Sequence, residues 1–380
     1  MDEAPYKKLA RHLDKMPGGY PSTKNGLEIR LLKRLFTPEE ANLACHLTPI
    51  PETAGVIAFR AHIDTRSAAE KLEEMARKGL IYRFRRRGQE TRFSANQFVV
   101  GIWEFHVNDL DPELIKDMNE YIPTLLDLNI WKKSPQLRTI PVGKSIDHKM
   151  EILPHENAEE MVKKQKRFLV APCICRRERR MMGEGCDKPE ESCLIFGRGV
   201  EYYLENGLGR EITLDETLEI LHRAEKSGLV LQPSNSKKIV NICCCCGCCC
   251  QVLKNIKRHP RPAEMVSSPF RVVEDRSLCR GCEVCLERCP MEAVTLEDGK
   301  VKVNQNRCIG CGLCVTTCPE KALSLVRKPQ AELKPVPSTW LESLYRLGKL
   351  RRKIGPLRVA LMKWRSWRDR RRVARMEESL

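Results

Sequence analysis

The sequence predicts a multidomain α+β protein, and three observations support this fold class. At 380 residues, the chain is long enough for two or three domains that each bury a separate core. Its apolar residues change from a helical spacing to strict alternation and back, so helices and strands occur in separate runs. Nineteen of its 20 cysteines lie between Cys173 and Cys318, whereas the last 50 residues are strongly basic. We therefore expect separate N-terminal, cysteine-rich and basic regions.

Residues 1–110 are expected to combine helices with a basic hairpin. Residues 37–40 (TPEE) form a capping box with proline at the first helical position, which predicts the start of a helix. A further helix is expected to begin at Asp64 or Thr65 and to end at Gly79. Beyond Gly79, apolar residues alternate with arginines, and the turn at residues 86–88 (RRG) predicts a hairpin.

The order helix, helix, basic hairpin resembles the winged helix-turn-helix superfamily, and the stretch EKLEEMARKGLIYRFRRRG carries the resemblance. This resemblance implies DNA binding, with phosphate contacts from arginines of the hairpin. Those arginines are Arg83, Arg85, Arg86, Arg87 and Arg92. The expected recognition helix also carries Glu70, Glu73 and Glu74, which repel a phosphate backbone. We therefore favour the alternative, a protein-docking or structural domain, over DNA binding.

Residues 111–170 are expected to form a connecting helical segment, and residues 171–255 a cysteine-rich metal-binding region. Four cysteines lie within 21 residues from Cys173, and seven of the eight residues from 243 to 250 are cysteine. Adjacent cysteines rarely bridge each other without strain, and thiolate-rich clusters select iron–sulfur, zinc or cuprous ions. We predict a third metal centre here, an iron–sulfur cluster in preference to zinc.

Spacing does not decide which thiols bind this centre, because no single C-x2-C frame fits the region. The candidate ligands are Cys173, Cys175, Cys186, Cys193, Cys243, Cys245, Cys246, Cys248, Cys249 and Cys250. Residues 256–275, rich in proline and serine, are expected to be a linker into the next domain.

The most specific motif lies between Cys279 and Pro319. CRGCEVCLERCP is repeated as CIGCGLCVTTCP after an offset of 29 residues, and each half has the pattern C-x2-C-x2-C-x3-C-P. Eight cysteines at this doubled spacing are typical of a domain that holds two 4Fe-4S clusters. Zinc motifs pair their cysteines and do not show this repeat, so zinc is disfavoured here.

Residues 276–328 resemble the bacterial 2[4Fe-4S] ferredoxins, in which the fourth cysteine of each run serves the other cluster. The resemblance implies that one cluster is bound by Cys279, Cys282, Cys285 and Cys318. It implies that the second cluster is bound by Cys308, Cys311, Cys314 and Cys289. Over its whole length the chain resembles multidomain 4Fe-4S binding proteins of anaerobic bacteria and archaea, which supports the cofactor more than any specific role.

Residues 329–380 predict a basic tail of two amphipathic helices that are separated at Gly355-Pro356. The last 50 residues hold 14 lysines and arginines against 5 acidic residues, and tryptophans lie among them. Such helices suit an anionic membrane surface or an acidic partner. The alternative, equally favoured, is that they pack back on the protein with a solvated basic face.

The leading hypothesis is an intracellular electron-transfer protein that exchanges single electrons with a redox protein partner. A redox-sensing transcription regulator and a reductase with a catalytic cluster in the cysteine-rich region are the alternatives. Neither G-x-G-x-x-G after a strand nor a Walker A loop occurs, so enzyme status stays open. The polar N-terminus and the many thiols favour a reducing cytoplasm, that of an anaerobe, with membrane association through the tail as an option.

Overall fold

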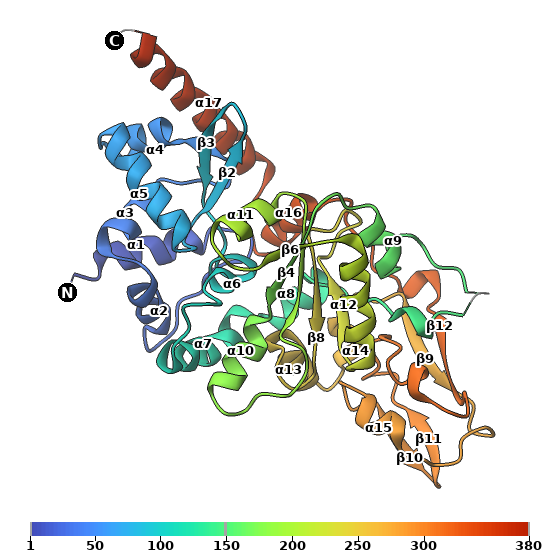
Figure 1. The fold of residues 1–380 in the computed structure, drawn as a ribbon. Helices are drawn as coiled ribbons and strands as arrows, with labels where there is room; N and C mark the ends of the chain where they lie inside the picture. The colour runs from blue at the N-terminus through green and yellow to red at the C-terminus, as the bar shows by residue number, and fades with distance from the viewer. Residues whose placement is uncertain (1, 148–149, 379–380) are drawn as a thin grey trace. The chain divides into compact units, whose positions relative to one another are not determined.

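The computed structural model describes residues 2–147 and 150–378, which divide into two compact units (Figure 1). Unit 1 joins Met1–Leu125 to the short segment Glu205–Leu208 and to the C-terminal segment that begins at Leu344. Unit 2 comprises Leu126–Leu204 and Gly209–Ser343. The predicted connecting segment, residues 111–170, is therefore divided between the units, and most of the basic tail belongs to the same unit as the N-terminal region.

Unit 1 is mainly helical, and side chains cap its helices where the sequence predicts. The reciprocal capping box forms at Thr37: its Oγ1 accepts from the Glu40 amide at 3.2 Å, and the Glu40 carboxylate accepts from the Thr37 amide at 2.8 Å. Asp64 caps the next predicted helix through the Ser67 amide at 2.8 Å. The helices are α1 Ala4–Leu13, α2 Leu27–Leu35, α3 Pro38–Ala44, α4 Ala54–Ala61, α5 Thr65–Arg77, α6 Trp103–Phe105, α7 Pro112–Leu125 and α17 Pro356–Glu378, with α16 Trp340–Leu350 at the unit boundary and η1 Phe98–Ile102 before α6.

The predicted hairpin follows α5 and forms part of a three-stranded antiparallel sheet of order β1-β3-β2. The strands are β1 Glu52–Thr53, β2 Tyr82–Arg86 and β3 Gln89–Ser94. The DNA-binding alternative assigns Arg83 a phosphate contact, and this assignment is wrong, because the residue is only 4% exposed. Its guanidinium forms ion pairs with Glu73, at 2.9 Å, and with Glu205. Arg85 is bound by the same two carboxylates, at 2.9 and 3.0 Å, so these arginines stabilise unit 1.

The tail forms two helices that break at Gly355, as predicted. Helix α17 packs against α4, and a buried ion pair joins Asp369 to Arg60 at 2.8 Å. Its opposite face leaves Leu357 81% and Trp364 51% exposed. The tail therefore packs on unit 1 while it presents apolar and basic side chains to solvent. Among the described helices, none combines the length and the apolar character that a membrane span requires.

Unit 2 is built on a five-stranded antiparallel sheet of order β6-β4-β5-β8-β7. The strands are β4 Phe168–Pro172, β5 Glu191–Phe196, β6 Arg210–Ile212, β7 Val230–Pro233 and β8 Asn241–Cys245. Helix α12 (Leu214–Lys226) packs against β4, β5 and β7. Residues 213–216 (TLDE) also predict a capping box. Thr213 caps α12 through the Glu216 amide at 3.1 Å, while the Glu216 carboxylate pairs with Arg210 at 2.7 Å, so only the Thr213 half of this box forms.

The rest of unit 2 contains two smaller antiparallel sheets, β10-β11 and β12-β9. The strands are β9 Phe270–Glu274, β10 Val294–Glu297, β11 Lys300–Val303 and β12 Leu323–Arg327. The remaining helices are α8 Leu128–Lys133, η2 Gly143–Ser145, α9 Ala158–Lys163, α10 Ile174–Met181, α11 Gly199–Glu205, α13 Gln251–Lys257, α14 Pro262–Met265, α15 Val284–Arg288, η3 Val315–Thr317 and η4 Gln330–Glu332.

The predicted linker, residues 256–275, is wrong because most of it is folded. It contains the end of α13, all of α14 and strand β9, whose five residues pair with β12 in register from Phe270↔Arg327 to Glu274↔Leu323. Phe270 is fully buried and Val272 nearly so. Strand β9 is therefore part of the domain that holds the repeated cysteines, and it supplies one side of that domain's core.

Candidate metal centres

The first set of repeated cysteines surrounds a hollow of about 350 Å³. Cys279, Cys282, Cys285 and Cys318 all line it, although Cys318 lies 33 residues beyond Cys285 in the chain. The second set, Cys289, Cys308, Cys311 and Cys314, lines a hollow of about 330 Å³. The structure therefore brings the eight thiols together in the crossed grouping that the ferredoxin resemblance implies.

Backbone amides converge on the sulfurs of both hollows. The sulfur of Cys279 accepts from the amides of Gly281 at 3.4 Å and Val301 at 3.3 Å. The sulfur of Cys308 accepts from the Val272 amide at 3.4 Å. The amides of Ala293 and Ala322 donate to Cys289 at 3.2 Å and to Cys318 at 3.3 Å. Amide donors stabilise negative charge on sulfur and tune the potential of a bound cluster, so the donor set fits a thiolate-bound cluster.

Val272 and Val301 were not predicted as donors, and the internal repeat could have revealed both. Val272 and Val301 differ by 29 positions, the same offset that separates Cys279 from Cys308. The repeat therefore extends upstream of Cys279 and includes strand β9. The cysteines alone do not reveal this extension, because the first of them stands five residues after β9 ends.

A glycine near each hollow lets a backbone carbonyl oxygen come closer to it than any side chain would allow. Gly310 adopts φ +68°, and a Cβ built on it would lie 2.1 Å from the Phe270 carbonyl oxygen. Gly281 adopts φ +75°, and its Cβ would lie 2.6 Å from the Gly299 carbonyl oxygen. Both positions therefore require glycine for its left-handed backbone and for space.

The two hollows differ in their burial. Burial raises the pKa of the Cys308, Cys311 and Cys314 thiols above the ordinary value, so these groups are protonated until a metal displaces the proton. In the other hollow burial also raises the pKa of the Cys285 thiol, but Cys282 is exposed, and Val284 on the lining of that hollow is 44% exposed. The Cys279 hollow is therefore the one that faces solvent.

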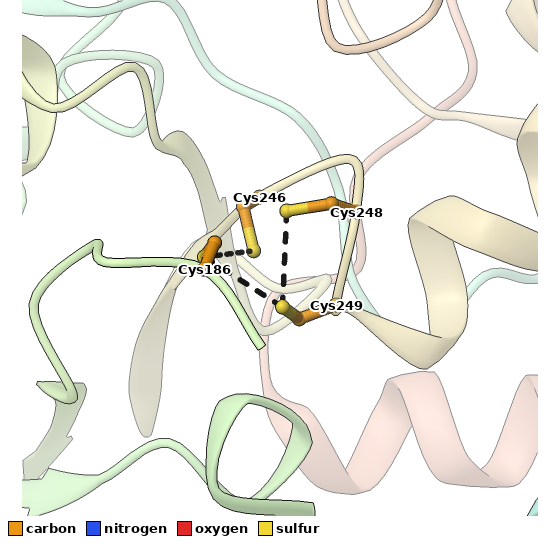
Figure 2. Close-up of side chains that lie close together, drawn as sticks. All are labelled: Cys186, Cys246, Cys248 and Cys249. Carbon is orange, nitrogen blue, oxygen red and sulfur yellow. Dashed lines mark hydrogen bonds between the residues drawn. The ribbon is translucent and has the colours of Figure 1, made fainter. Parts of the chain in front are cut away.

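Four cysteines of the cysteine-rich region form a compact group, which Figure 2 shows. The sulfur of Cys186 lies 3.9 Å from that of Cys246 and 3.6 Å from that of Cys249, and Cys249 lies 3.7 Å from Cys248. A single tetrahedral ion with bonds near 2.3 Å holds its sulfurs about 3.8 Å apart. A cubane spreads its four thiolates further, since each binds a different iron. The geometry therefore matches one tetrahedral ion.

The four-thiol group is assembled by two segments that are far apart in the chain. Cys186 lies in the loop between α10 and β5, while the other three lie in the turn between β8 and α13. Hydrogen bonds from Cys249 lower the pKa of Cys246 to about 3, and the Arg176 guanidinium acts in the same direction. Cys246 is therefore the thiol of this group whose surroundings most favour the thiolate form that binds a metal.

The other six predicted cysteines form a separate, elongated group. Its thiols contact one another in the order Cys173, Cys175, Cys250, Cys245, Cys243, Cys193. Strand pairing builds part of it, because β5 and β8 place Cys193 directly opposite Cys243. Strand alternation puts Cys243 and Cys245 on one face of β8 and the fully buried Cys244 on the other.

The single third centre predicted from the sequence therefore corresponds to two groups of thiols in the structure, one of four and one of six. All ten cysteines lie in unit 2, and each is a free thiol. The sequence could not separate the groups, because Cys246 of the four-thiol group stands directly after Cys245 of the six-thiol group.

Comparison with known proteins defines the class of the repeated-cysteine segment. Residues 271–319 match the family model described as a 4Fe-4S dicluster domain. This segment is thus an iron–sulfur, ferredoxin-like domain with a role in electron transfer or in an oxidoreductase. The match begins at Arg271, within strand β9, and so agrees with the inclusion of β9 in this domain.

Two curated relatives are corresponding subunits of the H(2):CoB-CoM heterodisulfide,ferredoxin reductase from Methanothermobacter thermautotrophicus and from Methanothermobacter marburgensis. Each is 45% identical over 41 residues, which is 11% of this chain and 6% of the relative. The chain thus spans only a small fraction of these relatives. No solved structure matches the chain significantly.

Proposed function

We propose that this protein carries single electrons between a redox protein partner and its own metal centres, by means of two 4Fe-4S clusters in the ferredoxin-like domain. The observation that carries the proposal is the sorting of eight thiols into two four-thiol hollows, each with amide donors to sulfur. Bound 4Fe-4S clusters supply one-electron chemistry at potentials that the surrounding hydrogen bonds adjust.

The chain's own residues determine where electrons enter and leave. Cys279, Cys282, Cys285 and Cys318 hold the exposed centre, whereas Cys289, Cys308, Cys311 and Cys314 hold the buried one. Leu278 is 50% exposed and Val284 44% exposed beside the first set, which gives a redox partner an apolar contact. A partner would therefore exchange electrons at the exposed hollow, and the buried hollow would hold the second cluster.

The four-thiol group of Cys186, Cys246, Cys248 and Cys249 serves as a third metal centre in this proposal. Its sulfur separations support a single tetrahedral ion, which favours zinc over the iron–sulfur cluster that the sequence led us to expect. With four protein ligands such a site is closed and structural. It would fix the turn between β8 and α13 to the loop before β5.

The experiment is a potentiometric titration of the anaerobically purified full chain, followed by electron paramagnetic resonance. We expect one-electron transitions from two clusters, with about eight irons and eight sulfides assigned to the ferredoxin-like domain. Cys282→Ser should abolish the signal of the exposed cluster. A preparation that binds zinc at the eight repeated cysteines, or that shows no one-electron transition, would overturn the proposal.

We also propose that the protein is cytoplasmic and that α17 binds the anionic face of a membrane. The outward face of α17 carries four apolar side chains, each more than half exposed: Leu357, Leu361, Trp364 and Trp367. The guanidinium of Arg368 stacks over Trp364 at 5.1 Å and that of Arg371 over Trp367 at 4.5 Å. Aromatic and cationic groups on one face suit the headgroup region of an anionic bilayer.

Vesicle sedimentation tests the proposed binding of α17 to an anionic membrane. The full chain should bind vesicles that contain phosphatidylserine and not vesicles of phosphatidylcholine alone. Replacement of Trp364 and Trp367 by alanine should weaken binding at least tenfold, whereas Leu278→Ala, a similarly exposed apolar residue of the other unit, should not. Equal sedimentation with both kinds of vesicle, or of both variants, would refute it.

A further inference from the structure

We propose that the six-thiol group, Cys173, Cys175, Cys193, Cys243, Cys245 and Cys250, is a further metal centre that binds a polynuclear iron–sulfur cluster. It is distinct from the four-thiol group and from both ferredoxin-type clusters. The inference does not depend on the proposed electron exchange with a partner, because it concerns metal binding alone.

The first argument is the arrangement of the thiols. Five local structures converge on the group: the ends of β4 and β8, strand β5, the first turn of α10 and the residue that precedes α13. Every thiol contacts at least one other thiol of the group, and none is bridged as a disulfide. Reduced thiols that crowd together from distant segments are the ligand set of a metal centre, since thiolates repel one another unless a cation lies between them.

The number of thiols indicates the kind of centre. A single tetrahedral ion accepts four ligands, and a single cubane accepts one thiolate for each of its four irons. Six thiols exceed both, and their contacts run from Cys173 through the other four thiols to Cys193. A cluster with more than four metal ions uses all six.

The second, independent argument is the buried cation Arg176. Its side chain is 1% exposed, and its Nη1 donates to the Cys244 carbonyl at 3.1 Å and to the Cys246 sulfur at 3.8 Å. A further hydrogen bond reaches the Ser192 hydroxyl, while the buried Nε has no partner. Among the described residues, no carboxylate forms an ion pair with it.

An uncompensated buried charge costs several kcal/mol, so the guanidinium needs negative charge nearby. The groups that act on it are thiols of both sets: Cys173 and Cys245 from the six-thiol group and Cys246 from the four-thiol group. Metal-bound thiolates on both sides supply the missing charge. Arg176 is therefore the positioning residue between two thiolate centres.

The test is the metal and sulfide content of the anaerobically purified full chain. We expect the wild type to contain iron and sulfide in clear excess of the eight that two 4Fe-4S clusters account for, together with one zinc. Cys175→Ser and Cys245→Ser should each remove this excess and leave the ferredoxin signals and the zinc unchanged. Cys244→Ala is the matched control, because its side chain lies on the opposite face of β8, and it should retain the full metal content.

Three further measurements keep the outcomes distinct. The double variant Cys282→Ser/Cys311→Ser should lose the ferredoxin iron and keep the excess, so failure of the ferredoxin proposal would show as unchanged total iron. Arg176→Leu should lower the reduction potential of the additional cluster, and Arg176→Lys should restore most of it, because a nearby cation stabilises the reduced form. A wild type with about eight irons, or with zinc in the six-thiol group, overturns the inference.

Discussion

Crossed ligation in the ferredoxin-like domain makes a prediction that combinations of variants can test. Cys318 belongs by sequence to the second C-x2-C-x2-C-x3-C-P run, yet it lines the same hollow as Cys282 of the first. Cys311, only seven positions before Cys318, lines the other hollow. The perturbation is Cys318→Ser, alone and combined either with Cys282→Ser or with Cys311→Ser.

The expected magnitudes follow from which thiols share a hollow. Cys318→Ser should remove about four irons, those of one 4Fe-4S cluster. Addition of Cys282→Ser should remove no more, because both changes affect the same cluster. Addition of Cys311→Ser should remove about eight irons in total, because the second cluster is lost as well.

The assay is iron and acid-labile sulfide per chain relative to the wild type, measured on anaerobically purified protein with far-ultraviolet circular dichroism to confirm folding. Cys45→Ser, which changes a thiol of unit 1 outside every metal group, is the control and should retain all the iron. The reverse pattern, with about eight irons lost on addition of Cys282→Ser and about four with Cys311→Ser, would show uncrossed ligation and refute the reasoning.

Three further predictions concern stability. Arg83→Met should destabilise unit 1 by about 2–3 kcal/mol in urea unfolding, because it leaves two partly buried carboxylates short of a partner, whereas the exposed Arg87→Met should change little. Burial lowers the pKa of His12 to about 4 from its usual 6.5. As pH falls, the unfolded chain therefore takes up this proton before the folded chain does. The free energy of unfolding should decrease by about 3 kcal/mol between pH 6.5 and pH 4, and His12→Gln should abolish this decrease. Gly310→Ala should lower the melting temperature and the iron content more than Gly299→Ala, since both have φ near +70° but only the first would clash; equal effects would contradict this.

The sequence by itself determined the ferredoxin-like domain. Its ligands lie in two short runs with fixed spacing, and the turns that present them are local. The pattern from Cys279 to Cys318 therefore predicts most of the placement of the eight cysteines. The capping box at Thr37, helix α5, the basic hairpin and the break at Gly355 are local in the same way, and the sequence predicted each of them. Even strand β9, which was not predicted, could have been inferred from the 29-residue offset between Val272 and Val301.

Only the tertiary structure decided how the upstream cysteines divide. Cys186 and Cys246 are 60 residues apart and meet through a loop, while Cys193 meets Cys243 through the register of β5 on β8. Register is set by which face of a sheet is buried, and spacing along the chain does not specify it. The same holds for Arg83 and Arg176, whose burial the sequence does not reveal: it depends on Glu205, 122 residues away, and on the Cys244 carbonyl, 68 residues away. Long-range pairing, and not composition, turned one cysteine-rich region into two separate groups of ligands.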